Sequence, residues 1–215
     1  MKQINYNYRL FGRSKGRGKN NKISNLAKEI ELKKINPLKY NVIDIGSGYG
    51  ESTIELGRRY KEKIFIACEK YIDGINNIAK KNKDELLNNI FIFQGNVNQL
   101  FDEYCTNNSI SEVWVLFPDP WPKKRHLKRR LINTIFFNKL KKILKKNSII
   151  HITSDSKLYI SEILKYIYEI KNDFLWLNQN KQEWNYSNLD LPKTKYYKKA
   201  LKNGLKPFYV KLLKL

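Results

Sequence analysis

Three glycines directly after a strand-like run constrain the fold of this chain more than any other feature. The run 40–45 has the pattern of a buried strand, and Gly46, Gly48 and Gly50 end it just before a helical pattern that begins near Glu51. Glycines at such a junction let the backbone turn sharply and approach a ligand closely. The sequence therefore predicts a strand, a glycine loop and a helix, which together form one unit of an α/β sheet.

The same alternation of strand and helix patterns continues toward the C-terminus. Further strands are expected at 63–68, 90–94, 112–117 and 148–153, and helices at 23–32, 51–60, 72–87, 127–144 and 158–170. Two late apolar runs, 174–177 and 208–213, predict an antiparallel edge hairpin. We therefore expect a Rossmann-like α/β fold with a doubly wound, mostly parallel sheet, whose ligand lies at the carboxyl ends of the strands.

The charge of the chain is large and unevenly distributed. Lys and Arg number 42 against 20 Asp and Glu, for a net charge of +22. The segments 11–22, 122–146 and 191–215 hold 24 of these basic residues and no acidic residue, so the remainder is near neutral. Clustered cations without an amphipathic membrane helix or lipidation motif favour a surface that binds nucleic acid.

Composition excludes several other classes of protein. No apolar run approaches the ~20 residues of a membrane span, and the polar N-terminus lacks the apolar region of a secretory signal. Cys68 and Cys105 are too few for a disulfide framework or a metal cluster. We expect a cytoplasmic protein that binds neither a membrane nor a metal.

The details of the glycine loop indicate which nucleotide-like ligand it suits. A dinucleotide fingerprint requires a further glycine where Glu51 stands, so NAD is disfavoured. The pattern G-x-G-x-G preceded by Asp44 resembles motif I of the S-adenosylmethionine-dependent methyltransferases. Glu69, at the end of the second strand, is expected to accept the ribose hydroxyls, and Asn96, after the third, to pair with the adenine edge. The alternatives are a simple tight turn and helix-capping roles for Glu69 and Asn96.

A proline-rich loop follows the fourth strand. In the segment 117–126 two prolines flank Asp119 and a third follows Trp121, which fixes backbone φ angles on both sides of the carboxylate. A carboxylate beside an aromatic ring can hold a nucleobase by its polar edge while the ring stacks on its face. The alternatives are ordinary turn chemistry for the loop and a structural role for Trp121, and His126 suits a structural or phosphate-binding role better than metal ligation.

The loop and motif I together resemble a known family. The pattern F-P-D-P-W-x-K-x-R-H at 117–126 is similar to that of the bacterial tRNA (guanine-N7)-methyltransferases, and the resemblance extends from Phe11-Gly12-Arg13 to the last strand. It implies a class I methyltransferase domain at 36–215, preceded by a basic arm and short helix at 1–35. It also implies methyl transfer from S-adenosylmethionine to guanine 46 in the variable loop of tRNA, by a monomer or homodimer.

The resemblance also implies roles for individual residues. Asp119 is expected to be the catalytic residue and to contact the cofactor, and the other cofactor-binding residues are expected to be Asp44, Gly46, Gly48, Glu69 and Asn96. The substrate-binding residues are expected to be Lys123, Arg125, Asp155, Thr194 and Tyr197. Phosphates of the RNA are expected to meet the basic residues that follow the motif: Lys123, Lys124, Arg125, Lys128, Arg129 and Arg130.

Two of these assignments have alternatives. Asp155 follows the fifth strand and could instead cap the helix near Leu158. The family's late motif is T-x-(F/Y)-E, whereas this chain has Tyr197 in place of the glutamate, so Thr194 and Tyr197 could instead have a plain hairpin role.

Two rival functions remain at this level. One is a non-enzymatic RNA-binding protein with a methyltransferase fold, which the intact glycine loop, Glu69 and Asp119 argue against. The other is methylation of an exocyclic adenine nitrogen, whose motif has two prolines between the acid and the aromatic residue. Only one proline separates Asp119 from Trp121, which favours guanine N7.

Overall fold

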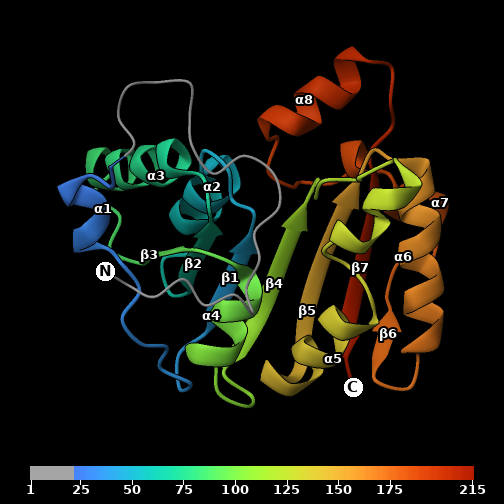
Figure 1. The fold of residues 1–215 in the computed structure, drawn as a ribbon, viewed down its shortest axis with the longest axis horizontal. Helices are drawn as coiled ribbons and strands as arrows, with labels where there is room; N and C mark the ends of the chain where they lie inside the picture. The colour runs from blue at the N-terminus through green and yellow to red at the C-terminus, as the bar shows by residue number, and fades with distance from the viewer. Residues whose placement is uncertain (1–21) are drawn as a thin grey trace.

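A computed structural model describes residues 22–215 and contains one seven-stranded sheet of order β3-β2-β1-β4-β5-β7-β6 (Figure 1). The basic arm expected at 11–19 lies outside the described residues. Neighbouring strands among β1 to β5 run parallel, whereas β7 runs antiparallel between β5 and β6. This confirms the expected doubly wound sheet with an antiparallel edge hairpin. The strands are β1 Asn41–Ile45, β2 Ile64–Glu69, β3 Ile90–Gln94, β4 Ile110–Leu116, β5 Leu144–Ser154, β6 Phe174–Trp176 and β7 Phe208–Lys214.

Helices cover both faces of the sheet and close two apolar cores. One core joins the sheet to α4, α5 and α6, and the other joins it to α2 and α3. No helix among the described residues is both long and apolar enough to cross a membrane. The α-helices are α1 Asn25–Glu29, α2 Glu51–Arg59, α3 Ile72–Asp84, α4 Val97–Glu103, α5 Thr134–Ile143, α6 Lys157–Glu169, α7 Lys181–Trp184 and α8 Lys195–Lys202, with 3₁₀ turns η1 Lys124–Arg129 and η2 Tyr186–Asn188.

The prediction of a single helix at 127–144 is wrong. The chain forms η1, an extended turn, and then α5, because Arg130 adopts an extended backbone conformation and Asn133 caps a new helix. The Asn133 side chain accepts a hydrogen bond from the Phe136 amide at 2.9 Å, which satisfies a donor that has no partner within the helix. The segment after Leu144 already belongs to β5, so that strand begins four residues before the expected start.

Helix α8 begins in the segment for which the sequence allowed either a substrate site or a plain hairpin role, at Thr194 and Tyr197. Thr194 caps it by accepting a hydrogen bond from the Tyr197 amide at 3.3 Å. Only Tyr197 and Ala200 of this helix are buried, and Figure 1 shows α8 above the carboxyl end of β4. The sequence did not predict this helix, and it brings residues near 195 to the edge of the sheet where the glycine loop lies.

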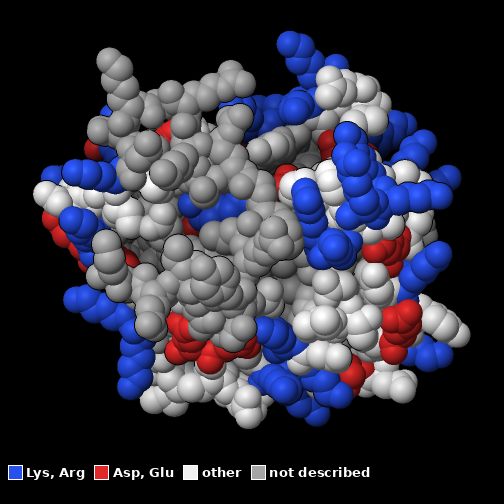
Figure 2. Space-filling view, in the orientation of Figure 1, with Lys and Arg blue, Asp and Glu red and all other residues white. Residues whose placement is uncertain are grey.

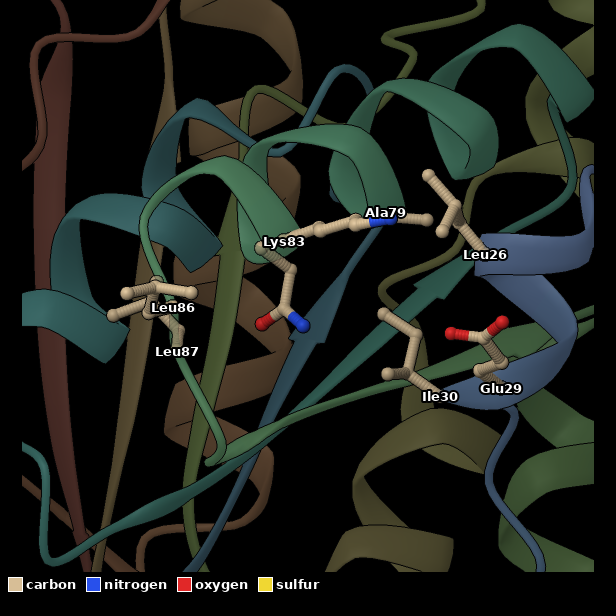
Figure 3. A pocket seen from close by; sticks show the side chains of 8 residues that line it. Leu26, Glu29, Ile30, Ala79, Lys83, Leu86 and Leu87 are labelled. Atoms are coloured by element: carbon tan, nitrogen blue, oxygen red, sulfur yellow. The ribbon is translucent and has the colours of Figure 1, made fainter.

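The segment before β1 packs on the domain. Its backbone pairs with β3 through the Ile92 amide to the Ile30 carbonyl at 2.9 Å and the Leu32 amide to the Ile92 carbonyl at 2.8 Å. Helix α1 then leaves a groove of about 270 Å³ against the C-terminal half of α3 (Figure 3). Because α3 starts at the carboxyl end of β2, this groove lies toward the opposite end of the sheet from the glycine loop.

Candidate active site

The glycine loop joins β1 to α2 in a conformation that favours glycine. Gly46, Gly48 and Gly50 have φ angles of 71°, 56° and 78°, a region that other residues enter only with strain. Among residues 22–215, a side-chain carbon added at Gly46 would meet no atom within 4 Å, and one at Gly48 would meet only the Gly46 carbonyl oxygen at 4.0 Å. Space is therefore open beside the loop, where a ligand can approach the backbone.

A fourth glycine sets how close helix α3 comes to this loop. A side-chain carbon at Gly74 would lie 2.2 Å from the Gly48 carbonyl oxygen, far inside contact distance. Sequence reasoning did not single out Gly74, because it lies within a helical pattern and only the packing of α3 against the loop gives it a role.

Glu69 ties the glycine loop to the end of β2. Its carboxylate accepts hydrogen bonds from the Gly48 amide at 2.8 Å, the Lys70 amide at 2.7 Å and the Tyr71 amide at 3.0 Å. A carboxylate has roughly four acceptor positions, so these three amides leave capacity for a hydroxyl donor. The structure therefore places Glu69 beside the loop, as expected for a ribose-binding residue at a strand end.

Asp44 lies beneath the loop and is 1% exposed. Its carboxylate accepts hydrogen bonds from the Ser52 and Thr53 hydroxyls, each at 2.6 Å. Burial raises the pKa of Asp44, although these two hydroxyls oppose that effect. The side chain thus holds the first turn of α2 against β1, which positions the glycine loop between them.

Asn96 follows β3 and caps α4. Its side-chain oxygen accepts a hydrogen bond from the Asn98 amide at 2.8 Å, which is the capping alternative weighed above. The preceding Gly95 amide donates to the Glu69 backbone carbonyl at 3.1 Å, so Asn96 lies one strand away from Glu69 at the same edge of the sheet.

The proline-rich loop after β4 brings Asp119 to the same edge. Phe117 and Trp121 flank it with φ angles of 54° and 39°, conformations that residues other than glycine rarely adopt and that recur at functional sites. The Phe117 amide donates to the Thr153 carbonyl of β5 at 2.8 Å, which fixes the start of the loop. Asp119 is exposed and makes no hydrogen bond or ion pair with any described residue, so its carboxylate remains available to a ligand.

Arg130 holds this loop in place. The expectation that Arg130 contacts an RNA phosphate is wrong, because its side chain is buried and ion-paired. Its side chain is 4% exposed, its Nε donates to the Pro120 carbonyl at 2.7 Å, and its guanidinium pairs with Glu162 of α6. Arg129 stacks over the ring of Trp121 at 5.0 Å, while His126 meets that ring edge-on at 5.6 Å. Trp121 therefore packs against two side chains of η1 and is half-buried.

Tyr196 of α8 lies near the candidate site, and the sequence did not indicate it. Partial burial together with the negative charges of Asp119 and Glu69, and with Tyr49, raises the pKa of Tyr196. Figure 1 shows α8 above the carboxyl end of β4, the strand that leads to Asp119. The Glu51 carboxylate also accepts a hydrogen bond from the Lys195 amide, which fixes the start of α8 to the first turn of α2.

The other residues expected to bind substrate, Asp155, Thr194 and Tyr197, differ in their burial and contacts. Asp155 follows β5 and is half-buried, and the cap of α6 is Ser156 instead, so the capping alternative for Asp155 is wrong. Tyr197 is 7% exposed and packs on Tyr186 at 5.3 Å, with the Lys193 ammonium over its ring at 4.9 Å. Thr194 caps α8. Tyr197 therefore contributes to an apolar cluster beneath the edge of the sheet.

Basic side chains surround this edge. Figure 2 shows Lys and Arg side chains gathered over the segment after the proline-rich loop and around α8. The exposed members include Lys123, Lys124, Arg125 and Lys128 from the loop and η1, and Lys195, Lys198, Lys199 and Lys202 from α8. Among residues 22–215 no group of three or more His, Cys, Asp or Glu side chains is placed to hold a metal ion.

Comparison with known proteins agrees with this arrangement. A family model described as "Putative methyltransferase" matches residues 39–210. A tRNA (guanine-N(7)-)-methyltransferase of Buchnera aphidicola subsp. Schizaphis graminum is 33% identical over 168 residues, which are 78% of this chain and 69% of that protein. The chain belongs to the tRNA (guanine-N7)-methyltransferase family.

Another member of the family, from Nitrosomonas europaea, is 37% identical over 57% of this chain and 55% of its own length. Solved methyltransferases share the fold at low sequence identity. An rRNA methylase from Streptococcus thermophilus has a TM-score of 0.55 at 16% identity and covers 88% of this chain and 92% of its own. A SAM-dependent methyltransferase from Aquifex aeolicus has a TM-score of 0.54 at 12% identity, with coverages of 88% and 97%. This chain therefore shares its overall fold with these methyltransferases.

Proposed function

We propose that this protein transfers the methyl group of S-adenosylmethionine to N7 of guanine 46 in the variable loop of tRNA. The observation that carries the proposal is the order of three parallel strands: β1, which leads into the glycine loop, lies between β2, which ends at Glu69, and β4, which leads into the loop of Asp119. Both carboxylates therefore lie beside the glycine loop at the carboxyl edge of the sheet, and the names of the relatives supply the reaction.

The residues around the glycine loop suit S-adenosylmethionine. Space is open beside Gly46 and Gly48, and the buried Ser47 hydroxyl has no hydrogen-bond partner among the described residues, so a donor or acceptor of a ligand can pair with it. Glu51 at the start of α2 would repel a pyrophosphate but not a ligand without phosphates. Glu69 would accept the ribose hydroxyls, and Asn96 would lie near the adenine.

The reaction at guanine N7 does not require a general base. N7 carries an in-plane lone pair and no proton, so the protein must align the base and stabilise positive charge without removing a proton. When bound, the cofactor supplies an activated methyl group on a positively charged sulfur. Asp119 would accept hydrogen bonds either from the N1–H and N2–H edge of guanine or from the amino group of the cofactor. The negative charge of Asp119 would also stabilise the positive charge that arrives on the purine.

The basic surface around the site suits a folded RNA. Lys123 and Arg125 lie on the loop that carries Asp119, and four lysines of α8 flank it on the other side. Such side chains neutralise phosphates with little dependence on sequence, so RNA affinity should fall steeply with salt. We expect the reaction to take place in the cytoplasm.

The test is a methyl-transfer assay with labelled S-adenosylmethionine and an unmodified tRNA transcript, followed by digestion and mass spectrometry of the nucleosides. Wild-type protein is expected to form 7-methylguanosine, and Asp119→Ala to reduce turnover by about 10²-fold, because its interaction acts mainly in the transition state. A transcript with adenosine at position 46 is the matched substrate control.

Calorimetry with S-adenosylhomocysteine separates the two roles of Asp119. If the carboxylate holds guanine, Asp119→Ala binds this ligand as tightly as the wild type; weaker binding assigns Asp119 to the amino group of the cofactor. Methylation of another base would refute the guanine-N7 proposal, and turnover equal to wild type in Asp119→Ala would refute the role of Asp119.

A further inference from the structure

A second groove lies at the β7 side of the molecule and plays no part in the site described above. It has a volume of about 400 Å³, within the ~300–1,000 Å³ of small-ligand pockets. Helix α7, the turn η2 and the start of β7 form its walls, and Trp184 and Phe208 supply its aromatic surface.

The aromatic side chains of this groove are held in a fixed stack. Trp184 lies on Trp176 of β6 with ring centroids 5.3 Å apart and planes 19° apart, and Phe208 lies 5.6 Å from Trp184 on a tilted plane. The indole Nε1 of Trp176 donates to the Asn178 side-chain oxygen at 2.9 Å, which locks the lower ring. Rings fixed in this way offer a flat surface on which a nucleobase can stack without ordering a mobile side chain first.

The rim of the groove has the charge and polarity that a nucleotide needs. Lys181 and Lys206 are exposed, and neither ammonium group makes a hydrogen bond or ion pair with residues 22–215. The one carboxylate of α7, Glu183, is occupied by the Gln179 amide at 2.8 Å and the Asn180 side chain at 2.7 Å. Two cations therefore face solvent beside the stack, and neither is ion-paired within residues 22–215.

The groove is joined to the candidate active site through the backbone. Phe208 pairs with Ser154, the residue before Asp155 at the end of β5, so both lie at the same edge of the sheet. The Tyr186 amide donates to the Pro207 carbonyl at 3.2 Å, and the Tyr186 ring meets Phe117 edge-on at 6.0 Å. One fully buried tyrosine thus contacts both the groove and the loop that carries Asp119.

From these observations we infer that the groove binds an unpaired nucleotide of the RNA substrate. The base stacks on Trp184 and Phe208, and the adjoining phosphates pair with Lys181 and Lys206. Asn185 and Asn188 also line the groove. Their side-chain amides bond to each other at 3.4 Å, to the Ser187 amide and to the Gln182 carbonyl, and each NH₂ group keeps a second N–H for the polar edge of the base. The inference rests on the proposed function, since it concerns the same RNA, but it adds a second contact beyond the methylated guanine.

The first test measures binding of a fluorescein-labelled pentaadenylate and of the unmodified tRNA transcript by fluorescence anisotropy, without cofactor. Trp184→Ala is expected to weaken both about tenfold, or about 1.4 kcal/mol, since one base–aromatic stack is worth about 1–3 kcal/mol. Lys181→Ala with Lys206→Ala tests the groove without disturbing the stack. The matched control is Lys33→Ala with Lys34→Ala, which removes the same charge from exposed positions elsewhere. The inference requires the groove lysines to weaken binding at least threefold more than this control.

Ultraviolet crosslinking of the pentaadenylate locates the contact directly. Trp176 and Trp184 lie in separate tryptic peptides, 172–181 and 182–193, and Trp114 and Trp121 share a third, 84–123. Mass spectrometry therefore distinguishes Trp184 from the other three tryptophans, and adducts are expected on peptide 182–193. Adducts confined to other peptides, or groove variants that bind like the control, would overturn the inference. A wild-type dimer that Trp184→Ala dissociates would also overturn it, because the groove would then hold a second copy of the chain.

These outcomes are separable from those of the proposed function. If wild type forms 7-methylguanosine while the groove variants match the lysine control, the groove inference fails and the proposed function stands. If wild type binds pentaadenylate through peptide 182–193 but forms no 7-methylguanosine, the proposed function fails and the groove remains a nucleotide site.

Discussion

Replacing Gly74 with alanine tests whether the packing of α3 sets the position of the glycine loop. The added carbon would lie 2.2 Å from the Gly48 carbonyl oxygen, whereas ordinary contact begins at 3.4 Å, so helix and loop must separate by about 1.2 Å. A backbone carbonyl cannot rotate away as a side chain does. The displacement would therefore stretch the hydrogen bond of 2.8 Å from the Gly48 amide to Glu69.

The magnitudes decide the sign of the effect on stability. Alanine gains about 0.5–1 kcal/mol over glycine within a helix, while overpacking costs about 1–3 kcal/mol, so the free energy of unfolding should fall by about 1–2 kcal/mol. For a protein of this size that lowers the Tm by about 2–8 °C. A hydrogen bond to a charged group contributes about 1.5–3 kcal/mol, so losing part of it should weaken cofactor affinity about tenfold.

The assay combines thermal unfolding with calorimetry of S-adenosylhomocysteine binding. Gly57→Ala is the matched control, because its added carbon would meet the flexible end of the Ile90 side chain at 2.8 Å, away from the loop. The control should bind the ligand as wild type does. If Gly74→Ala retains both the wild-type Tm and the wild-type affinity, the reasoning that α3 fixes the loop is refuted.

Three further predictions concern the supports of the site and the sheet. Arg130→Ala should lower kcat more than it changes S-adenosylhomocysteine affinity, because the loop carrying Asp119 loses its bond to Pro120; equal loss of both by kinetics and calorimetry would contradict this. Thr194→Val removes the cap of α8 and should cost about 1 kcal/mol in denaturant unfolding, and an unchanged midpoint would argue against the cap. Burial alone would raise the pKa of Glu112, but His151 and Lys63 lower it from 4.5 to about 2. The stability that Glu112 contributes is therefore complete above pH 4.5 and is lost as the pH falls toward 2. Denaturant unfolding should show a weaker pH dependence over this window for Glu112→Gln, and equal slopes would refute the assignment.

The parts of the fold that the sequence predicted are those with strong local patterns. Strand β1 is buried at all five residues, as a strand within a parallel sheet should be, and its end at Gly46 follows from the φ angle that glycine permits. The edge hairpin of β6 and β7 was predicted for the same reason, since both runs are apolar.

The parts that the sequence did not predict depend on contacts between distant segments. The helical pattern at 127–144 continues through Arg130, and only the partners Pro120 and Glu162 explain why the chain turns there. The basic character of Arg130 indicated phosphate binding, but charge alone does not distinguish a surface arginine from one that is buried in an ion pair.

The sequence by itself determined the class of fold and the glycine loop, because hydrophobic periodicity and backbone preferences act over a few residues. It indicated Asp119 through the resemblance of the segment 117–126 to a family motif. The tertiary structure decided what surrounds that carboxylate. Helix α8, with Tyr196, lies at the carboxyl edge of the sheet because its first amide is fixed to α2 through Glu51, a contact across 144 positions of sequence. Such a contact depends on how the helices and strands pack around two apolar cores, and no local pattern encodes it.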